Sequence, residues 1–204
     1  VLNSSHYILC EDTRVSQKLL TKYNIKSKLI SNHKFNEKSN ISKIIKILEK
    51  NKIISLISDA GTPCISDPGL IILRECLKKN IKIFSVPGPS AVTAAVSLTT
   101  FGEKYIFCGF FPEKEKDIKN ISIEFLKLNY SLVFFISSQK LKKKISIIKK
   151  YFSDRNVVIC KEITKIYEEY LRLEVSQLDN TIPKLNGEIT IVFSPREIIS
   201  FNHL

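Results

Sequence analysis

The sequence predicts an α/β protein of two lobes, the first built around a largely parallel sheet. Short apolar runs of strand length alternate with segments whose apolar residues fall on one helical face. Two of these runs end in loops rich in glycine and proline that lead into helices. The alternation breaks at residues 99–103 and then resumes. We therefore expect a first lobe at residues 1–100, a second at 101–204 and a hinge at the break.

The first lobe opens with strands and helices in turn. Strands are expected at residues 7–10, 28–31 and 53–57. The last of these is an apolar run typical of a buried strand. Two helical stripes lie between them, the first made of Val15, Leu19, Leu20 and Tyr23, the second of Ile41, Ile44, Ile45 and Leu48. Asn40 is the expected N-cap of the second stripe, after a polar loop at 33–39.

The segment SDAGTPCISDPG, residues 58–69, is the most informative motif of the chain. It follows a predicted buried strand and precedes a helix whose apolar residues Leu70, Leu73 and Leu77 share a face. Asp67 is the expected N-cap of that helix and Pro68 its first residue. The simplest interpretation of residues 58–69 is an ordinary turn, and the alternative is a loop that binds a ligand. A loop at the carboxyl end of a strand exposes backbone N–H groups, which suits a nucleotide-like ligand.

A second loop repeats this arrangement. A predicted strand at 81–86 leads into Pro87, Gly88, Pro89 and Ser90, and then into a helix of small residues at 91–96. Small side chains permit close approach by a flat ligand or another backbone. The two loops together predict one crevice with two walls.

The second lobe continues the rhythm of strands and helices. Strands are expected at residues 105–111, 132–136, 157–161 and 189–193. Helices are expected at 121–128 and, with a basic surface, at 141–152.

Composition excludes several classes of protein. The five Cys residues are dispersed and lack any Cys-x-x-Cys spacing, which argues against disulfides and a zinc site. The three His residues are too scattered to suggest metal ligands, so no metal is expected. No apolar run approaches the ~20 residues that cross a bilayer. We therefore expect a cytoplasmic protein that does not bind a membrane.

The formal net charge is +12, and Lys far outnumbers Arg. A basic surface favours nucleic acid, because lysine ammonium groups neutralise phosphates. The alternative is that an AT-rich genome enriches Lys whatever the partner. The charge is thus compatible with RNA binding without establishing it.

Six motifs occur in order along the chain: CEDTR (10–14), SDAGTPCISDPG (58–69), VPGPSAVTAAVSL (86–98), FCGFFP (107–112), KEITK (161–165) and NGEITIVF (186–193). Together they resemble the bacterial ribosomal RNA small-subunit methyltransferase I family, which has the tetrapyrrole-methylase (class III) fold. The resemblance covers essentially the whole chain, and the two central motifs are its most specific part. It implies a mixed sheet in the second lobe.

The resemblance also implies a reaction and its partners. The methyl donor would be S-adenosylmethionine, held between the lobes, and the acceptor a cytidine 2′-hydroxyl in the decoding region of 16S rRNA within the 30S subunit. A homodimer is implied as well. Matching to the family's loops gives the residues expected to hold the donor: Ala60, Gly61, Thr62, Pro63, Ile65, Pro87, Gly88, Ser90 and Ala91. Ile65 as a core residue and Ser90 as a helix-end hydrogen bonder are the alternatives.

Acidic and RNA-facing candidates flank the donor loops. Asp59, Asp67 and Glu11 are candidate catalytic carboxylates that could accept the ribose proton. Helix capping is the competing role for Asp67 and for Asp12. The residues expected to contact RNA are Thr13, Arg14, His33 and Asn36. Lys161 and Lys165 could stabilise an alkoxide, although a solvated role is the simpler expectation.

The chain departs from the family pattern at two places. Residues 136–140 read ISSQK where the family carries a Glu-Ser-Pro-His-Arg-like segment. The family's opening strand has no counterpart here, and it would lie between the strands at 53–58 and 81–86. These two strands should therefore not be hydrogen-bonded neighbours, and should lie roughly 10 Å apart, twice the usual strand spacing.

Two other functions remain open on the sequence. The same fold could methylate a tetrapyrrole or another small molecule, since fold does not fix substrate. The chain could also be a truncated remnant without enzymatic activity that only binds RNA or dimerises.

Overall fold

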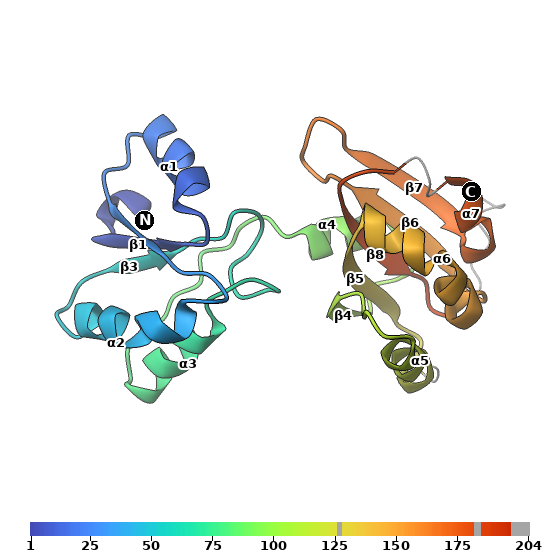
Figure 1. The fold of residues 1–204 in the computed structure, drawn as a ribbon, viewed down its shortest axis with the longest axis horizontal. Helices are drawn as coiled ribbons and strands as arrows, with labels where there is room; N and C mark the ends of the chain where they lie inside the picture. Colours follow the sequence, from blue (N-terminus) through green and yellow to red (C-terminus); the bar gives the residue numbers. More distant parts are fainter. Residues whose placement is uncertain (126–127, 182–184, 197–204) are drawn as a thin grey trace. The chain divides into compact units, whose positions relative to one another are not determined.

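The computed structural model describes residues 1–125, 128–181 and 185–196, and these divide into two compact units, Val1–Ser90 and Ala91–Leu204 (Figure 1). The division lies before the predicted boundary at residues 100 and 101. Helix α4 (Ala91–Ser97), which follows the division, packs on strand β8 (Glu188–Phe193) of the second unit. Among the described residues no helix is both long and apolar enough to span a membrane.

The first unit contains a three-stranded parallel sheet. Its strands are β1 (Tyr7–Cys10), β2 (Lys28–Ser31) and β3 (Ile54–Leu56), in the order β2-β1-β3. Tyr7 lies opposite both Lys28 and Ile54, so the three strands begin at nearly the same level. The expected parallel sheet of the first lobe is confirmed.

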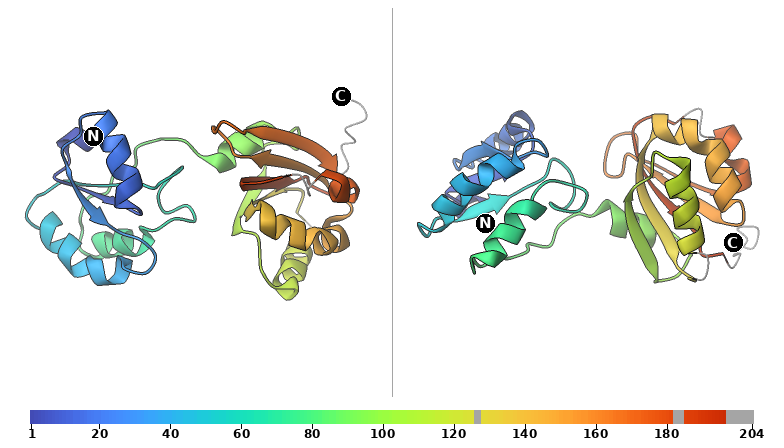
Figure 2. Two further views of the ribbon diagram at one scale, coloured as in Figure 1. Left: turned by 45° about the horizontal axis from the view of Figure 1, so that its top comes forward. Right: turned by 60° about the horizontal axis from the view of Figure 1, so that its bottom comes forward.

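Helices cover both faces of this sheet (Figures 1 and 2). Helices α2 (Glu37–Leu48) and α3 (Leu70–Lys78) pack on one face, and α1 (Thr13–Lys22) lies on the other; a short 3₁₀ helix, Leu2–Ser4, precedes β1. The core beneath α2 and α3 consists of Leu9, Ile30, Ile44, Ile45, Ile72 and Cys76. Ile44 and Ile45 belong to the predicted apolar stripe, which explains why this side of α2 faces the sheet.

The structure corrects the prediction of a strand at residues 81–86. These residues form no strand, and in the described sheet β3 pairs with β1 alone. A segment without a ladder partner buries little, and Phe84 and Val86 are 82 % and 63 % exposed. The expectation that residues 53–58 and 81–86 are not paired is confirmed, while their separation stays a prediction.

Two predicted helix starts are wrong. Helix α2 begins at Glu37, and Asn40, inside its first turn, donates from its side-chain amide to the Ser31 carbonyl oxygen. Helix α3 begins at Leu70 with Gly69 as its N-cap residue, so Asp67 does not cap it and Pro68 is not its first residue.

The cap of α3 comes instead from a neighbouring helix. The Glu37 carboxylate oxygen Oε1 accepts hydrogen bonds from the backbone N–H groups of Gly69, Ile71 and Ile72, at 3.0, 3.0 and 3.3 Å. Glu37 is only 5 % exposed. A negative charge is stabilised at a helix N-terminus, where the N–H groups lack intrahelical partners. One side chain therefore joins the first turn of α2 to the first turn of α3.

The second unit contains a five-stranded mixed sheet, as expected. Its order is β4-β5-β8-β6-β7, with β4 parallel to β5 and the other neighbours antiparallel. The bounds are β4 Tyr105–Phe110, β5 Ser131–Ser137, β6 Asn156–Lys161, β7 Glu169–Glu174 and β8 Glu188–Phe193. Strand β7 was not predicted from the sequence; it is an edge strand, its residues are exposed or half-buried, and charged residues interrupt its apolar ones.

Helices cover this second sheet on both faces. Helices α5 (Glu115–Glu124) and α6 (Ser138–Phe152) pack on one face and α4 on the other (Figure 1). The predicted helix at 121–128 is wrong in its bounds, because Glu115 and Asp117 supply favourable acidic residues to an earlier first turn. The 3₁₀ helix Val175–Gln177 and helix α7 (Leu178–Thr181) follow β7. Phe152 of α6 stacks on Phe193 of β8 with 4.7 Å between ring centroids.

Replacing Glu37 by Ala should destabilise the first unit. The change leaves three N–H groups at the start of α3 without an acceptor, and hydrogen bonds to a charged group contribute about 1.5–3 kcal/mol. We expect the free energy of opening α3, measured by amide hydrogen exchange, to fall by about 2–3 kcal/mol. Glu49→Ala is the control, since Glu49 is exposed and its one ion pair among the described residues is with Lys79; the change should cost under about 1 kcal/mol. Equal effects of the two changes would contradict the capping role.

Candidate functional site

Three of the segments that carry predicted site residues leave the first sheet at one edge. Because β1, β2 and β3 are parallel and in register, the segments after Cys10, Ser31 and Leu56 all start at the carboxyl ends of the strands. Chain order reverses at β1, since β2 lies on one side of it and β3 on the other. Ligands of open α/β sheets bind at such a reversal point. The first unit thus assembles its candidate site at this edge.

The loop at residues 58–69 has an unusual backbone. Gly61, Cys64, Ser66 and Gly69 all have positive φ, at 74°, 69°, 66° and 131°. Such angles are costly for Cys and Ser and cluster at functional sites. A Cβ atom at Gly69 would lie 2.4 Å from Leu56 Cδ2 and 2.7 Å from Cys64 Sγ, so only glycine fits there. The surrounding structure fixes the path of this loop.

The two predicted donor loops are in contact within the first unit. Thr62 Oγ1 donates to the Pro89 carbonyl oxygen at 2.9 Å, and the Ser58 hydroxyl makes 3.1 Å contacts with the carbonyl oxygens of Ala60 and Gly61. Ile65 is 44 % exposed, which argues against a core role. Ala91 begins α4 and belongs to the second unit.

Both glycines of these loops leave space where a side chain would stand. An added Cβ at Gly61 would meet only the Pro89 carbonyl oxygen at 3.9 Å, and one at Gly88 only the Val86 carbonyl oxygen at 4.0 Å. Gly88, unlike Gly61, has no positive φ. The backbone of both loops is therefore open to a ligand.

Two thiols near the site are held protonated. Burial raises the pKa of Cys64, and the negative charges of Glu37 and Asp67 raise it further. Burial likewise raises the pKa of Cys10; a hydrogen bond with Ser16 opposes this rise, and the charges of Asp59 and Asp12 add to it. These electrostatic neighbours place Asp59 near the end of β1 and Asp67 near the turn at Cys64. Of the candidate carboxylates, Asp59 is exposed, whereas Asp67 and Glu11 are half-buried.

Asp12 caps α1, as the capping alternative predicts. Its carboxylate accepts from the Arg14 backbone N–H at 2.8 Å, and the Arg14 guanidinium forms a bidentate pair with it at 3.0 and 2.6 Å. These bonds hold the pKa of Asp12 well below its usual range. Thr13 is the first residue of α1. Arg14 is thus oriented by Asp12 while its side chain remains 87 % exposed.

The turn between β2 and α2 is held by its own polar groups. Asn36 Oδ1 accepts from the His33 N–H at 2.7 Å, and Asn36 Nδ2 donates to the Ser31 carbonyl oxygen at 3.2 Å. His33 Nδ1 accepts from the Phe35 N–H at 3.3 Å. These bonds make Asn36 a residue that shapes the turn. Beside it the buried Asn32 side-chain amide has no hydrogen-bond partner among the described residues.

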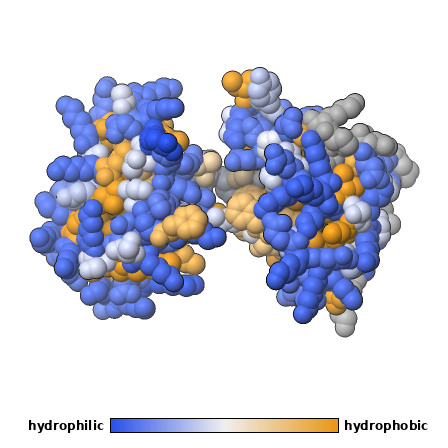
Figure 3. All heavy atoms as spheres, in the orientation of Figure 1, coloured by the Kyte–Doolittle hydropathy of each residue, from blue (hydrophilic) through white to orange (hydrophobic). Residues whose placement is uncertain are grey.

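Lys161 and Lys165 are neutralised within the second unit. Lys161 pairs with Glu169 at 2.7 Å, and Lys165 pairs with Glu162 at 3.1 Å and Glu188 at 2.8 Å. Both ammonium groups thus have carboxylate partners, which weakens the case for their stabilising an alkoxide. The loop that joins β6 and β7 exposes apolar atoms at its tip (Figure 3), where Ile166 is 93 % exposed.

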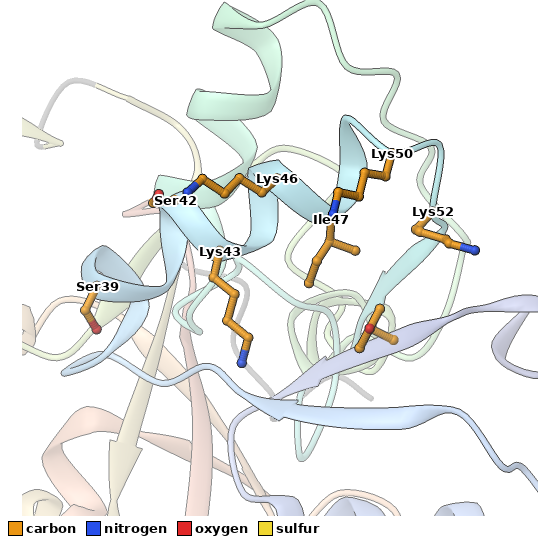
Figure 4. A pocket seen from close by; sticks show the side chains of 8 residues that line it. Ser39, Ser42, Lys43, Lys46, Ile47, Lys50 and Lys52 are labelled. Atoms are coloured by element: carbon orange, nitrogen blue, oxygen red, sulfur yellow. The ribbon is translucent and has the colours of Figure 1, made fainter.

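A basic groove lies along α2 in the first unit (Figure 4). It has a volume of about 660 Å³, and its lining includes Tyr7 and four lysines, Lys43, Lys46, Lys50 and Lys52. Lys43 and Lys46 project from α2, and Lys50 and Lys52 from the turn after it. Across the described chain, no carboxylate forms an ion pair with any of these four lysines. We call this feature the lysine groove; its charge is uncompensated.

Sequence reasoning missed three features of this unit: the capping carboxylate of Glu37, the exposed ring of Phe35 and the lysine groove. The spacing of Lys43, Lys46 and Lys50 at three and four residues was a readable signal of one helical face. No local sequence pattern marked Glu37 as a helix cap, because its hydrogen-bond partners lie more than 30 residues away. In the described part of the chain, no group of three or more His, Cys, Asp or Glu residues could hold a metal ion.

Comparison with known proteins agrees with this architecture. Residues 1–179 match the family described as Tetrapyrrole (Corrin/Porphyrin) Methylases. A protein of Thermotoga maritima named ribosomal RNA small subunit methyltransferase I is 40 % identical over 93 % of this chain and 86 % of its own length. A protein of the same name from Mesomycoplasma conjunctivae is 40 % identical over 96 % of this chain and 83 % of its own.

Solved structures share the fold at low sequence identity. A cobalt precorrin-4 methyltransferase of cobalamin biosynthesis aligns with a TM-score of 0.63 and 18 % identity over 95 % of this chain and 85 % of its own. A uroporphyrin-III C-methyl transferase from Thermus thermophilus, complexed with S-adenyl homocysteine, aligns with a TM-score of 0.62 and 11 % identity, over 96 % of this chain and 88 % of its own. From the family match and the close relatives together, the chain belongs to the tetrapyrrole methylase family of methyltransferases, in the group that carries the name ribosomal RNA small subunit methyltransferase I.

Proposed function

We propose that this protein transfers a methyl group from S-adenosylmethionine to the 2′-hydroxyl of a cytidine in the decoding region of 16S rRNA. The observation that carries the proposal is the loop at 58–69, which leaves the first sheet at its reversal point and contacts the loop at 87–90 through the Thr62–Pro89 hydrogen bond. The relatives' shared name supports an rRNA substrate. The proposal extends to the 30S subunit as substrate, a homodimer and a cytoplasmic location.

The residues at the loops fit a flat, polar donor. Open space at Gly61 and Gly88 would admit its adenosine portion against the backbone. Thr62, Ile65, Pro87 and Ser90 belong to the same two loops and would surround it. The donor, when bound, supplies an activated methyl group, so catalysis by the protein is chiefly positioning and exclusion of water. No metal takes part in this proposal.

The acceptor side requires a route for one proton. As the bond between the methyl carbon and the ribose oxygen forms, the bond to sulfur breaks and the hydroxyl proton must leave. Asp59 is our preferred acceptor of that proton, because it is exposed and follows β3 at the carboxyl edge of the sheet. Arg14 would contact an RNA phosphate, oriented by Asp12. Thr13, His33 and Asn36 border the same edge.

The first test is transfer of labelled methyl from S-adenosylmethionine to 30S subunits that lack the modification. We expect label in a cytidine ribose of 16S rRNA, located by nuclease digestion and mass spectrometry. A tetrapyrrole acceptor in a parallel reaction should receive no label. Label on the tetrapyrrole alone would favour the small-molecule alternative. Donor binding without any transfer would favour a non-enzymatic remnant.

Gly88 tests the donor site without straining the backbone. Gly88→Ala should fold normally, because its φ is ordinary and a Cβ meets nothing closer than 4.0 Å. We expect S-adenosylmethionine affinity, measured by calorimetry, to fall at least about tenfold, which is about 1.4 kcal/mol. Gly61→Ala is the comparison: its φ of 74° should add a loss of folding stability of about 1 kcal/mol. Unchanged affinity in Gly88→Ala would remove this loop from the donor site.

The lysine groove tests the RNA part of the proposal. Replacing Lys43, Lys46 and Lys50 together by Gln should weaken binding to 16S rRNA. It should also flatten the dependence of log affinity on log salt by about 2, because each neutralised phosphate contributes roughly 0.7–0.9 to that slope. The control replaces Lys78, Lys79 and Lys149, which pair with Glu75, Glu49 and Asp179, and so removes equal charge. Equal effects in both variants would mean that net charge alone matters.

A further inference from the structure

Phe35 is the most exposed aromatic residue of the first unit. Its side chain is 91 % exposed, and it stands in the turn between β2 and α2, at the edge of the sheet where the loop at 58–69 also begins. Apolar side chains of this size normally bury most of their surface. The exposure of Phe35 at this edge therefore suggests a role other than packing in the core.

The turn that carries Phe35 is fixed without any help from its ring. Four hydrogen bonds within residues 31–36 define the turn, and all of them use backbone groups, Asn36 or His33. Glu37, close by, is anchored to the start of α3. The ring itself meets His33 edge-on, with centroids 6.1 Å apart. The backbone thus presents the ring to solvent from a rigid support.

The surroundings of Phe35 are basic. Lys34 and Lys38 flank it, both are exposed, and neither forms an ion pair with a carboxylate of the described residues. Along α2 the lysine groove continues the positive charge. A partner that suits a flat apolar ring among unpaired ammonium groups has planar faces and an anionic backbone. Single-stranded RNA has both properties.

We propose that Phe35 is a stacking platform for an unpaired nucleobase of the RNA substrate, close to the nucleotide that is methylated. This inference rests on the proposed rRNA methyltransferase function. Aromatic rings bind bases by stacking, with little sequence preference, and charged neighbours hold the flanking phosphates. Phe35 then positions the acceptor strand at the carboxyl edge and takes no part in the chemistry.

The absence of Trp from the sequence makes a direct test possible. The variant Phe35→Trp carries a single tryptophan, whose fluorescence should be quenched when a single-stranded oligoribonucleotide of the decoding-region sequence is added. Tyr23→Trp is the matched control, because Tyr23 is 60 % exposed at the far end of α1. Quenching in Phe35→Trp but not in Tyr23→Trp supports stacking. Equal quenching in both variants would overturn it.

Affinity and turnover complete the test. Phe35→Ala and Phe35→Leu should each weaken RNA binding about 5- to 150-fold, or about 1–3 kcal/mol, with the same loss at low and high salt. Both should raise the KM for 30S subunits and leave the KM for S-adenosylmethionine unchanged. Phe35→Leu with normal affinity would show that apolar contact suffices, and would overturn stacking.

The outcomes separate this inference from the function on which it rests. If the unaltered protein methylates 30S subunits and the Phe35 variants do so equally well, the stacking role is rejected and the function stands. If the unaltered protein neither binds the oligoribonucleotide nor methylates 30S subunits, both are rejected. A Phe35→Ala variant that changes only the oligomeric state would identify a contact between copies instead, and would also reject stacking.

Discussion

The buried carboxylate of Glu37 organises the first unit. It closes the N-terminus of α3 with three hydrogen bonds, although it belongs to the first turn of α2. The loop at 58–69 ends at that N-terminus, and the turn at 32–36 leads into α2. Two segments that are distant in sequence are therefore fixed by one side chain. The strained backbone at Cys64 and Ser66 lies between β3 and this capped N-terminus, which holds the C-terminal end of the loop.

Parallel pairing explains why chemically different loops meet at one edge. In an antiparallel pair successive loops leave from opposite ends, whereas here each strand returns to the same start through a helix. The acidic segment after β1, the aromatic turn after β2 and the glycine-containing loop after β3 thus share a border. The second unit has a mixed sheet, with antiparallel pairing from β5 to β7, so its loops are divided between two edges.

Local patterns allowed much of the fold to be predicted. Strands β1, β5 and β6 contain continuous apolar runs, and the stripe that contains Ile44 and Ile45 showed the buried side of α2. Predictions failed where a residue distant in sequence took the role expected of a local one. Glu37, for example, caps α3 in place of Asp67. Residues 81–86 have strand composition but no strand partner among the described residues, and composition alone cannot supply hydrogen bonds. The loops at 58–69 and 87–90 could be singled out as candidate donor loops because glycine and proline mark backbone geometry directly.

The protonated thiol of Cys64 has a consequence for methyl transfer. A thiolate is a far stronger nucleophile than a ribose hydroxyl, and a sulfonium donor held at the loop, as proposed, would lie near Cys64. Burial, together with the charges of Glu37 and Asp67, raises the pKa of Cys64 and so disfavours the thiolate. If the donor binds as proposed, the carboxylate that anchors α3 would also help to keep Cys64 from competing with the acceptor for the methyl group.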